Sequence, residues 1–547
     1  MFRSAHLSRW LPPSLLALSL GGTYLATLAP GLTWANNGAD GGDLITAAAT
    51  GGVPHPSGYP TYLLLARLFQ FLPLGSIAFR TNLFSAVCTL LAAVLVYYLV
   101  ISLPYTPLRG NWLAGIISAY AFGLSPMLWS QAVISEVYGL HALFLVLILY
   151  LLPLGSDPPP VWRTRLDRIR GLVLGLGLGN HLTLAFLLPP MLLTGIMRRV
   201  GAVHSTYTES KRTNRVPGGV IDEDSAQRLC TAPTRLGAQH LLGRKSASWG
   251  DWSFDWRVLT RRAVWLGIGL LIYLTLPLRA MSHSPINWGD PVTLKNLIWL
   301  VSGRMYESYA FGVPAAFILP RIQAWVSLLV AQFGILGLLL GLFGLFYCHP
   351  LATRLNLVTG WLVIAYSAFS IGYNSYDAEI YLIPAFLAFS LWIGLGGAGL
   401  MEYLSRRARW LAPVAGILLI GYFLGFAAFN LPKVDASKDR QAEEYGQAVM
   451  TAMPEQALLF SSEDKATFTL WYFQFVLHER PDIAVLDTRL LSYDWYRNML
   501  RCAYPSLSVP EHAGVTVPAE IIAANASRPV CETSLSESSV VNCQKGY

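Results

Sequence analysis

The sequence predicts a polytopic membrane protein that is all-α across the membrane and carries a small α/β domain at its C-terminus. Of the 547 residues, 54% are hydrophobic and only 13% are charged, whereas soluble domains carry roughly 25% charged residues. Apolar runs about 20 residues long, enough to cross a bilayer as a helix, recur along the chain. The last part of the chain, by contrast, has the composition of a soluble domain.

The apolar runs predict about 11 membrane helices. Single helices are expected near residues 12–32, 82–101, 112–130, 138–153, 263–281, 322–346, 355–372, 380–398 and 411–430. Lys and Arg concentrate in alternate loops, which places those loops inside by the positive-inside rule. The basic segments on both sides of residues 169–196 fall on the same side only if this run is a hairpin of two short helices. We expect the hairpin to turn at "GLGNHLT", with Asn180 and His181 at the outer surface.

Domain boundaries follow from this topology. We expect a transmembrane domain over residues 1–430, with its first outer loop at 33–80 and a polar, disordered insertion on the inner side at 201–260. The N-terminal run is interpreted as an uncleaved first span, and a cleaved signal peptide is the alternative. Residues 431–547 are expected to form the outer α/β domain.

The tail pattern alternates strands and helices. "QALLFSSED" and "PDIAVLDTRLL" are typical of buried strands, and "KATFTLWYFQFVLHER" and "SYDWYRNMLRCAY" are typical of helices. One disulfide among Cys502, Cys531 and Cys543 is expected if the tail lies outside the cell membrane.

Charge and motifs exclude several classes of function. The net charge of +8 comes from basic residues in short loops between apolar runs, so it is a topology signal and not a nucleic-acid surface. The tail has no Gly-rich phosphate loop, which argues against a nucleotide site. The six cysteines form no CxxC pair, so a zinc site is not expected.

Carboxylates gather in the predicted outer loops, where several flank aromatic residues and glycines. They are Asp40, Asp43, Glu136, Asp290, Glu307, Asp377 and Glu379. Acids at membrane depth are costly and usually functional, although each of these is alternatively a solvated loop residue. The densest group is "DGGDLITAAATGGVPHPSGYP", residues 40–60, where Asp40 and Asp43 precede His55.

Each candidate residue on the predicted outer side of the membrane has either a role in catalysis or substrate binding, or a purely structural role. A carboxylate there is suited to act as a general base, and Arg279 to hold a phosphate through paired hydrogen bonds. Alternatively, Arg279 anchors a span end, Asp290 shapes a turn before a proline, and Asn180 caps a half-helix. His55 alternatively stiffens a turn, and His181 alternatively ends a helix.

Five motifs resemble, in order, one known family. They are "DGGDLITAAATGGVPHPSGYPTYLLLARLF", "AVISEVYGLHALF", "GLGLGNHLT", "LPLRAMSHSPINWGDPVTLKNLIWLVSGRMY" and "YLIPAFLAF". The chain resembles a former domain-of-unknown-function family of polytopic GT-C glycosyltransferases, which includes the animal endoplasmic-reticulum protein O-mannosyltransferase. The resemblance covers about residues 12–400, and the tail resembles the soluble part of short bacterial members.

The resemblance implies a GT-C-like fold and an inverting membrane glycosyltransferase, O-mannosyltransferase-like, with its active site on the extracytoplasmic side. Its donor would be a polyprenyl- or dolichyl-phosphate sugar, with mannose one option, and its acceptor a hydroxyl on protein, glycan or lipid. No nucleic-acid partner is expected. We expect a multi-pass protein that is located in the bacterial plasma membrane, with the active site and the C-terminal domain on the extracytoplasmic side.

Site residues carry over by position. Asp40 and Asp43 fall on the family's two first-loop acids, although the second is commonly Glu. His55 falls on a His-Pro element in which Ser57 replaces the usual second proline. The remaining positions, expected to bind substrate, are Glu136, Asn180, His181, Arg279 and Asp290.

The expected mechanism has Asp40 as general base, with Asp43 as the second catalytic acid. Asp43 or Glu136 would orient the acceptor or bind a divalent cation, Mg or Mn, and the alternative is that no cofactor is required. The rival function is a transporter or flippase of lipid-linked saccharides, because short paired segments broken by glycine also occur in transporters.

Overall fold

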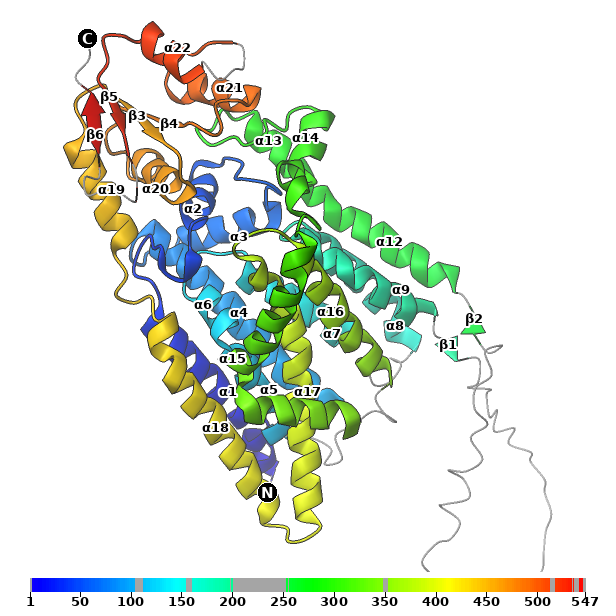
Figure 1. The fold of residues 1–547 in the computed structure, drawn as a ribbon. Coiled ribbons are helices and arrows are strands. Elements are labelled where there is room, and N and C mark those ends of the chain that lie inside the picture. The colour runs from blue at the N-terminus through cyan, green and yellow to red at the C-terminus, as the bar shows by residue number, and fades with distance from the viewer. Residues whose placement is uncertain are drawn as a thin grey trace, which may run out of the picture.

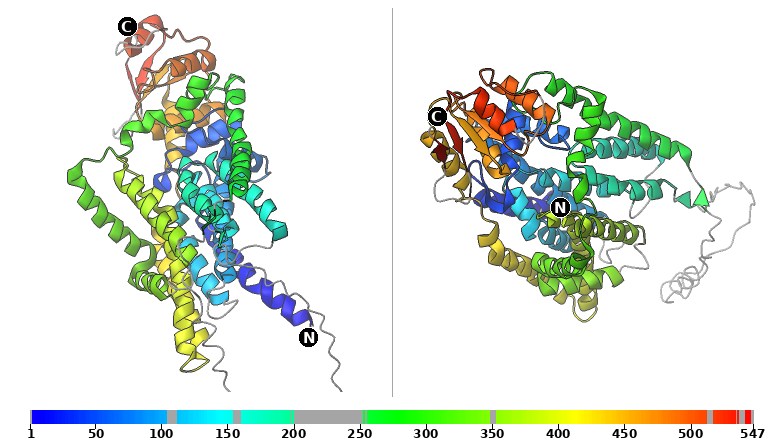
Figure 2. Two further views of the ribbon diagram at one scale, coloured as in Figure 1. Left: turned by 90° about the vertical axis from the view of Figure 1, so that its right-hand side faces the viewer. Right: turned by 45° about the horizontal axis from the view of Figure 1, so that its top comes forward.

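The computed structural model describes residues 2–103, 112–153, 160–196, 198–199, 252–253, 255–347, 353–511, 517–533, 535 and 541–544. Most of the predicted polar insertion, residues 200–251, lies outside these ranges. Helices make up a long bundle, and a small sheet sits at one end of it beside α2 (Figure 1). The left view of Figure 2 shows this sheet at the end of the molecule away from the N-terminus.

Helices and short 3-10 turns form the membrane part. In chain order they are α1 (Phe2–Thr27), η1 (Ala35–Asn37), α2 (Gly41–Thr50), α3 (Pro60–Gln70), α4 (Ile77–Ser102), α5 (Trp112–Gly123), α6 (Pro126–Ala132), α7 (Tyr138–Leu151), α8 (Pro160–Leu178), η2 (Leu182–Leu187), α9 (Leu188–Ile196), α12 (Trp256–Leu270), η4 (Leu271–Leu274), α13 (Thr275–Ala280), α14 (Leu294–Val301), η5 (Arg304–Tyr309), α15 (Ala315–Tyr347), α16 (Thr353–Gly372), η6 (Ala378–Leu382), α17 (Ile383–Ser405) and α18 (Leu411–Val434). A two-residue pairing, β1 (Arg198–Arg199) with β2 (Trp252–Ser253), joins α9 to α12.

Six helical segments in the described ranges are long and apolar enough to cross a membrane, or seven if α5 and α6 form one bent span. The chain is therefore a multi-pass membrane protein, as predicted, and the total of about 11 spans stays a prediction. The expected straight span at 112–130 differs, because α5 and α6 meet at a 70° bend. Pro126 has no N–H to continue α5, but it fits the first turn of a new helix.

The centre of the bundle is α17, which is buried along almost its whole length and packs against α5, α15, α16 and α18. Beside it, α8 and α12 lie in close contact (Figure 1). Gly175 permits this approach, since a Cβ there would come within 2.3 Å of the Leu266 carbonyl oxygen. Asp167 of α8 joins the two helices through a 2.8 Å contact to Arg262 of α12, and it also contacts Arg170 of its own helix at 3.0 Å.

The predicted break in the 169–196 run is present. Helix α8 ends at Leu178, residues 179–181 turn, and η2 starts at Leu182. His181 caps η2, because its side chain accepts from the backbone N–H of Thr183. The glycine-rich turn therefore ends one helical segment and starts another at the place the sequence indicated.

The C-terminal part is an α/β unit, as predicted. It comprises α19 (Gln441–Ala452), β3 (Leu458–Ser461), α20 (Asp464–Phe475), β4 (Ala484–Asp487), α21 (Asp494–Ala503), α22 (Val517–Ala524), β5 (Val530–Glu532) and β6 (Asn542–Gln544). The strand order is β4-β3-β5-β6, with β3 parallel to both neighbours and β6 antiparallel to β5. A disulfide links Cys531 to Cys543 across β5 and β6, and Cys502 is exposed and free.

This unit is joined to the first outer loop, which is itself helical where the sequence predicted a loop. Helix α20 packs on α2, and Gly42 makes the contact possible because a Cβ there would lie 2.5 Å from the Phe468 carbonyl oxygen. Trp34 donates from Nε1 to Thr469 Oγ1 at 3.1 Å. One buried apolar core therefore continues from α2 and α3 into the C-terminal sheet.

Candidate active site

Asp40 stands at the start of α2, in the N-cap position, but its carboxylate makes no capping hydrogen bond. Its side chain is 43% exposed, although the following residues of α2 are buried. An acid that is surrounded by protein, yet still open on one side, is available to an incoming hydroxyl group. Asp40 therefore has the placement that a general base requires.

Asp43 lies one turn further along α2 and is completely buried. Its Oδ2 accepts from the backbone N–H of His55 at 2.9 Å and lies 2.7 Å from His55 Nδ1. Its Oδ1 accepts from Trp288 Nε1 at 3.2 Å. Both oxygens are thus engaged with the protein, and Asp43 fixes the imidazole ring of His55.

His55 connects the two first-loop acids. Its Nδ1 faces Asp43, and its Nε2 lies 3.6 Å from Asp40 Oδ2. The Phe468 ring lies parallel to the imidazole, with 6.4 Å between ring centroids and 11° between planes. The "PHPSGYP" segment therefore places one imidazole between a buried carboxylate and an accessible one.

The charges of Asp40 and His55 shift each other's pKa. Burial raises the pKa of Asp40 to about 6, although the His55 charge opposes part of that rise. Burial alone would lower the pKa of His55, but the charge of Asp40 and the hydrogen bond to Asp43 outweigh it and raise the value to about 9. At neutral pH Asp40 is then largely ionised and His55 is positively charged.

The outer segment 279–296 packs against the C-terminal end of α2 and the residues that follow it. Val53 donates to the Ile286 carbonyl at 2.9 Å and accepts from Trp288 N–H at 3.1 Å. Arg279 donates to the carbonyls of Gly52 and Ala47, at 3.2 and 3.5 Å. The structure thus places Arg279 against the end of α2, and its role in binding phosphate stays a prediction.

Asp290 accepts from Asn287 Nδ2 at 3.1 Å, and its backbone carbonyl accepts from Asn296 Nδ2 at 2.9 Å. It has a left-handed backbone with φ of 43°. These contacts suit the alternative that the sequence left open, in which Asp290 shapes the turn before Pro291.

Glu136 is the predicted site residue whose electrostatics tie it to Asp40. It is buried, with 6% of the residue exposed. Burial, followed by the charge of Asp40, raises its pKa well above the usual value. Burial and the nearby Asp40 charge therefore both favour the protonated form of this carboxyl group.

Asn180 and His181 form the far side of this region. Asn180 is fully buried, and its Nδ2 donates to the Val137 carbonyl at 3.2 Å. His181 packs among Tyr138, Tyr381 and His141, with ring centroids 5.1 to 5.8 Å away. Its Nδ1 lies 2.8 Å from Thr183 Oγ1. No contact links it directly to His55 in the described residues.

The C-terminal unit contributes residues that the sequence reasoning missed. Asp464 lies one turn from Phe468 on α20, hence on the same helix face, and its charge contributes to the raised pKa of Asp40. Arg489 contacts Asp464 at 2.6 Å and buried Asp487 at 2.7 Å. A partly exposed Arg–Asp pair therefore lies within electrostatic reach of Asp40.

A divalent-cation site is not formed by the predicted ligands in this arrangement. Both oxygens of Asp43 already accept hydrogen bonds. Within the described ranges, no three or more His, Cys, Asp or Glu side chains group in a way that could hold a metal ion. Metal binding by Asp43 or Glu136 stays a prediction.

Comparison with known proteins supports the resemblance inferred from the motifs. Residues 40–203 match the family described as protein O-mannosyl-transferase TMEM260 N-terminal domain, and residues 442–516 match TMEM260-associated domain 2. Two separate regions of the chain are therefore similar to domains of the TMEM260 O-mannosyltransferase family. The first match begins at Asp40, and the second includes α20 and β4.

Two curated relatives align over most of this chain. Protein O-mannosyl-transferase tmem260 of Dictyostelium discoideum is 24% identical over 515 residues, which are 84% of this chain and 55% of that protein. Protein O-mannosyl-transferase TMEM260 of Mus musculus is 23% identical over 506 residues, which are 86% and 62%. The chain thus spans little more than half the length of these relatives. Both are eukaryotic, so a bacterial plasma membrane stays a prediction.

One solved structure has a similar fold over most of the chain. The crystal structure of ArnT from Cupriavidus metallidurans bound to undecaprenyl phosphate matches with a TM-score of 0.52 and 12% identity. The match covers 89% of this chain and 91% of that one. The predicted fold class, a helical membrane domain of GT-C type with a small α/β part at the C-terminus, is confirmed.

Proposed function

We propose that this protein is an inverting membrane glycosyltransferase that moves a sugar, mannose by analogy with its relatives, from a polyprenyl- or dolichyl-phosphate donor to a protein hydroxyl. The names of the relatives support the acceptor class, and the lipid phosphate held by ArnT supports the donor class. The observation that carries the proposal is the accessible Asp40 carboxylate, paired with a His55 ring that buried Asp43 holds in place.

In the proposed reaction Asp40 takes the proton from the acceptor hydroxyl as its oxygen attacks C1 of the sugar. The bond between C1 and the phosphate oxygen breaks, the new C1–O bond forms on the opposite face, and the lipid phosphate leaves with the bonding electron pair. Only one displacement occurs, so the configuration at C1 inverts. Asp40 then returns its proton to solvent through its exposed side.

His55 keeps Asp40 in the reactive state. Its positive charge lowers the pKa of Asp40 against the effect of burial, so more of the base is ionised at neutral pH. The hydrogen bonds to Asp43 hold the ring in one orientation, as a second carboxylate does for the histidine of hydrolytic triads. Asp43 is thus a positioning residue in this mechanism, not a second base.

The Asp464–Arg489 pair is partly exposed, and the charge of Asp464 reaches Asp40. Arg489 is held by Asp487, which is completely buried, so its donors are presented with little loss of conformational entropy on binding. We assign the Asp464–Arg489 pair to acceptor binding, in which peptide carbonyls and hydroxyls form hydrogen bonds with Arg489 and Asp464.

The test is turnover of the full chain in lipid, using a panel of radiolabelled polyprenyl- and dolichyl-phosphate sugars with hydroxyl peptides. Asp40→Asn should lose at least about 100-fold in turnover, because a positioned general base contributes about 10²–10⁴-fold, and should still bind donor. Glu307→Gln is the matched control, an outer carboxylate whose side chain is 78% exposed.

Each result decides between functions. Loss in Asp40→Asn with activity kept in Glu307→Gln supports the proposal, and chelator treatment of the active protein decides whether a divalent cation takes part. Equal activity in Asp40→Asn and wild type would contradict the assignment of the base. Movement of donor across the bilayer without sugar transfer would identify a lipid-linked-saccharide transporter instead.

A further inference from the structure

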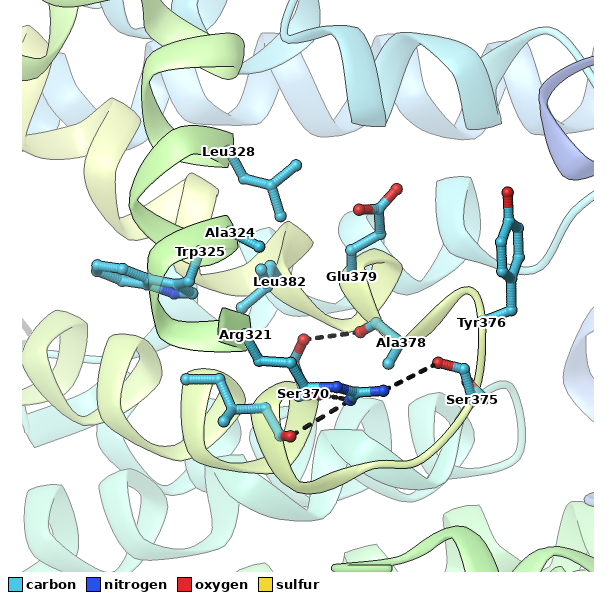
Figure 3. Close-up of a pocket in the computed structure, with 11 residues that line it drawn as sticks. Arg321, Ala324, Trp325, Leu328, Ser370, Ser375, Tyr376, Ala378, Glu379 and Leu382 are labelled. Atoms are coloured by element: carbon cyan, nitrogen blue, oxygen red, sulfur yellow. Dashed lines mark hydrogen bonds between the residues drawn. The ribbon is translucent and has the colours of Figure 1, made fainter. Parts of the chain in front are cut away.

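A separate cavity of about 160 Å³ lies between α15, α16 and η6, at the outer ends of these membrane helices. Arg321, Trp325 and Glu379 are among its lining residues (Figure 3). A second cavity, of about 360 Å³, shares Arg321 and continues along α15 past Phe317. The mechanism proposed above uses none of these side chains.

Backbone carbonyls hold the guanidinium group of Arg321 in a fixed position. It donates to the Tyr373 carbonyl at 2.6 Å and to Ile371 and Ser375 carbonyls at 3.3 and 3.4 Å. These partners are dipoles without net charge, so the positive charge of Arg321 is oriented but not neutralised. An oriented, uncompensated guanidinium at the water–membrane boundary attracts an anion, and phosphate fits its geometry well.

Glu379 supplies the opposite charge but does not neutralise Arg321. No ion pair joins the two side chains within the described ranges, and Figure 3 shows the carboxylate and the guanidinium well apart, on different parts of the cavity lining. Two opposite charges separated by a cavity in a partly apolar setting are costly unless a dipolar group lies between them.

Apolar side chains around the cavity are suited to contact the hydrocarbon part of a lipid. Trp325, Leu328 and Leu382 line the first cavity. On the side of Arg321 that leads into the membrane, α15 presents exposed apolar side chains, including Val326 and Ile322 at 49% and 42% exposure. A ligand seated on Arg321 therefore has a continuous apolar surface along which hydrocarbon chains can lie.

We propose that this cavity binds the headgroup of a zwitterionic phospholipid of the outer leaflet, with its phosphate on Arg321, its ammonium toward Glu379 and its acyl chains along α15. A polyprenyl phosphate offers the phosphate but no ammonium, and Glu379 would repel it. The site is distinct from the Asp40–His55 site and does not depend on the proposed transferase activity.

The test is native mass spectrometry of the detergent-purified full chain, titrated with phosphatidylethanolamine, phosphatidylglycerol or a polyprenyl phosphate. Wild type should retain phosphatidylethanolamine about tenfold better than phosphatidylglycerol, the effect of one charged contact. Glu379→Gln should remove this preference while phosphate binding persists, and Arg321→Gln should weaken both phospholipids.

Arg80→Gln is the matched control, because Arg80 likewise donates to three backbone carbonyls, and it should bind lipids as wild type does. Glu379→Gln leaves the carbonyl contacts of Arg321 in place, so the proposal stays testable if Arg321→Gln fails to fold. Equal retention of the two phospholipids by wild type would overturn the proposal. Loss of polyprenyl-phosphate binding in Arg321→Gln, with phosphatidylethanolamine binding unchanged, would overturn the proposal and assign the cavity to the donor.

Discussion

Two buried histidines, His55 and His181, sit in the same outer part of the molecule with opposite electrostatics. They are 6% and 8% exposed. Burial lowers the pKa of both rings. For His55 the neighbouring carboxylates outweigh burial and raise the pKa to about 9, whereas His181 has no such partners and its pKa falls to about 4. At neutral pH one ring is therefore positively charged and the other is neutral.

The difference lies in the partners and not in the depth. His55 has Asp43 on one nitrogen and Asp40 near the other, while His181 has a threonine hydroxyl and aromatic rings. A buried imidazole keeps its charge only where carboxylates offset the cost of desolvation. The charged histidine is thus suited to tune a catalytic acid, and the neutral one to line a substrate-binding wall.

The largest effect is expected when the carboxylate that creates the difference is removed. Asp43→Asn takes away the negative partner of a buried charged ring, and breaking such a pair costs about 3–5 kcal/mol. We expect turnover to fall at least about 100-fold and thermal stability to drop. Turnover assays and thermal unfolding of the same preparations measure both.

Asp290→Asn controls for the loss of an acid from the segment that packs behind Asp43, and it should remain within about threefold of wild type in turnover. If Asp43→Asn kept full activity and stability, the proposed role of Asp43 in holding His55 would be wrong.

A direct comparison of the two rings should give a smaller effect. His55→Gln loses the ion-pair partner of Asp40, and the loss of a close charge pair of this kind should lower kcat about 10- to 100-fold. His181→Gln loses a neutral contact and should change kcat by less than about tenfold. Steady-state kinetics on both variants measure the ratio, and equal losses would remove the basis of the comparison.

The smallest effect is expected from the aromatic contact across the two domains. Phe468→Leu keeps most of the apolar volume but removes the ring parallel to His55, so kcat should fall about two- to tenfold with donor KM unchanged. Phe423→Leu makes the same change at a membrane-core position, 3% exposed, and should leave kcat as it is. A rise in KM alone would make Phe468 a substrate contact and not a positioning residue.

The membrane fold and the first-loop acids were predictable because they depend on local signals. Apolar run length marks the membrane helices, and the glycines before Asn180 mark the break after α8. Scarce charge elsewhere makes Asp40 and Asp43 conspicuous. The strands of the tail were predicted from their apolar runs, and β3 and β4 lie inside the two segments chosen.

The contacts between distant segments were not predictable in the same way. Phe468 and Asp464 lie more than 400 positions from Asp40, in a tail that the sequence presents as a separate soluble unit. The sequence alone gives Trp288 the pattern of an aromatic residue at the membrane interface, but in the structure its Nε1 donates a hydrogen bond to Asp43. Likewise, nothing local in Asp43 distinguishes a second base from a residue that holds a histidine.

The most direct test of the account is the pH dependence of kcat/KM for wild type beside His55→Gln. Asp40 must be ionised to accept a proton, so activity should rise with pH up to about 6 and then level. His55 loses its charge above about 9, but Asp40 is already fully ionised there, so activity should stay level through that range. In His55→Gln the acid limb should move to higher pH because the charge that lowers the pKa of Asp40 is gone. An unchanged profile in the variant, or no ionisation near pH 6 in wild type, would contradict the claim that His55 tunes Asp40 as the base.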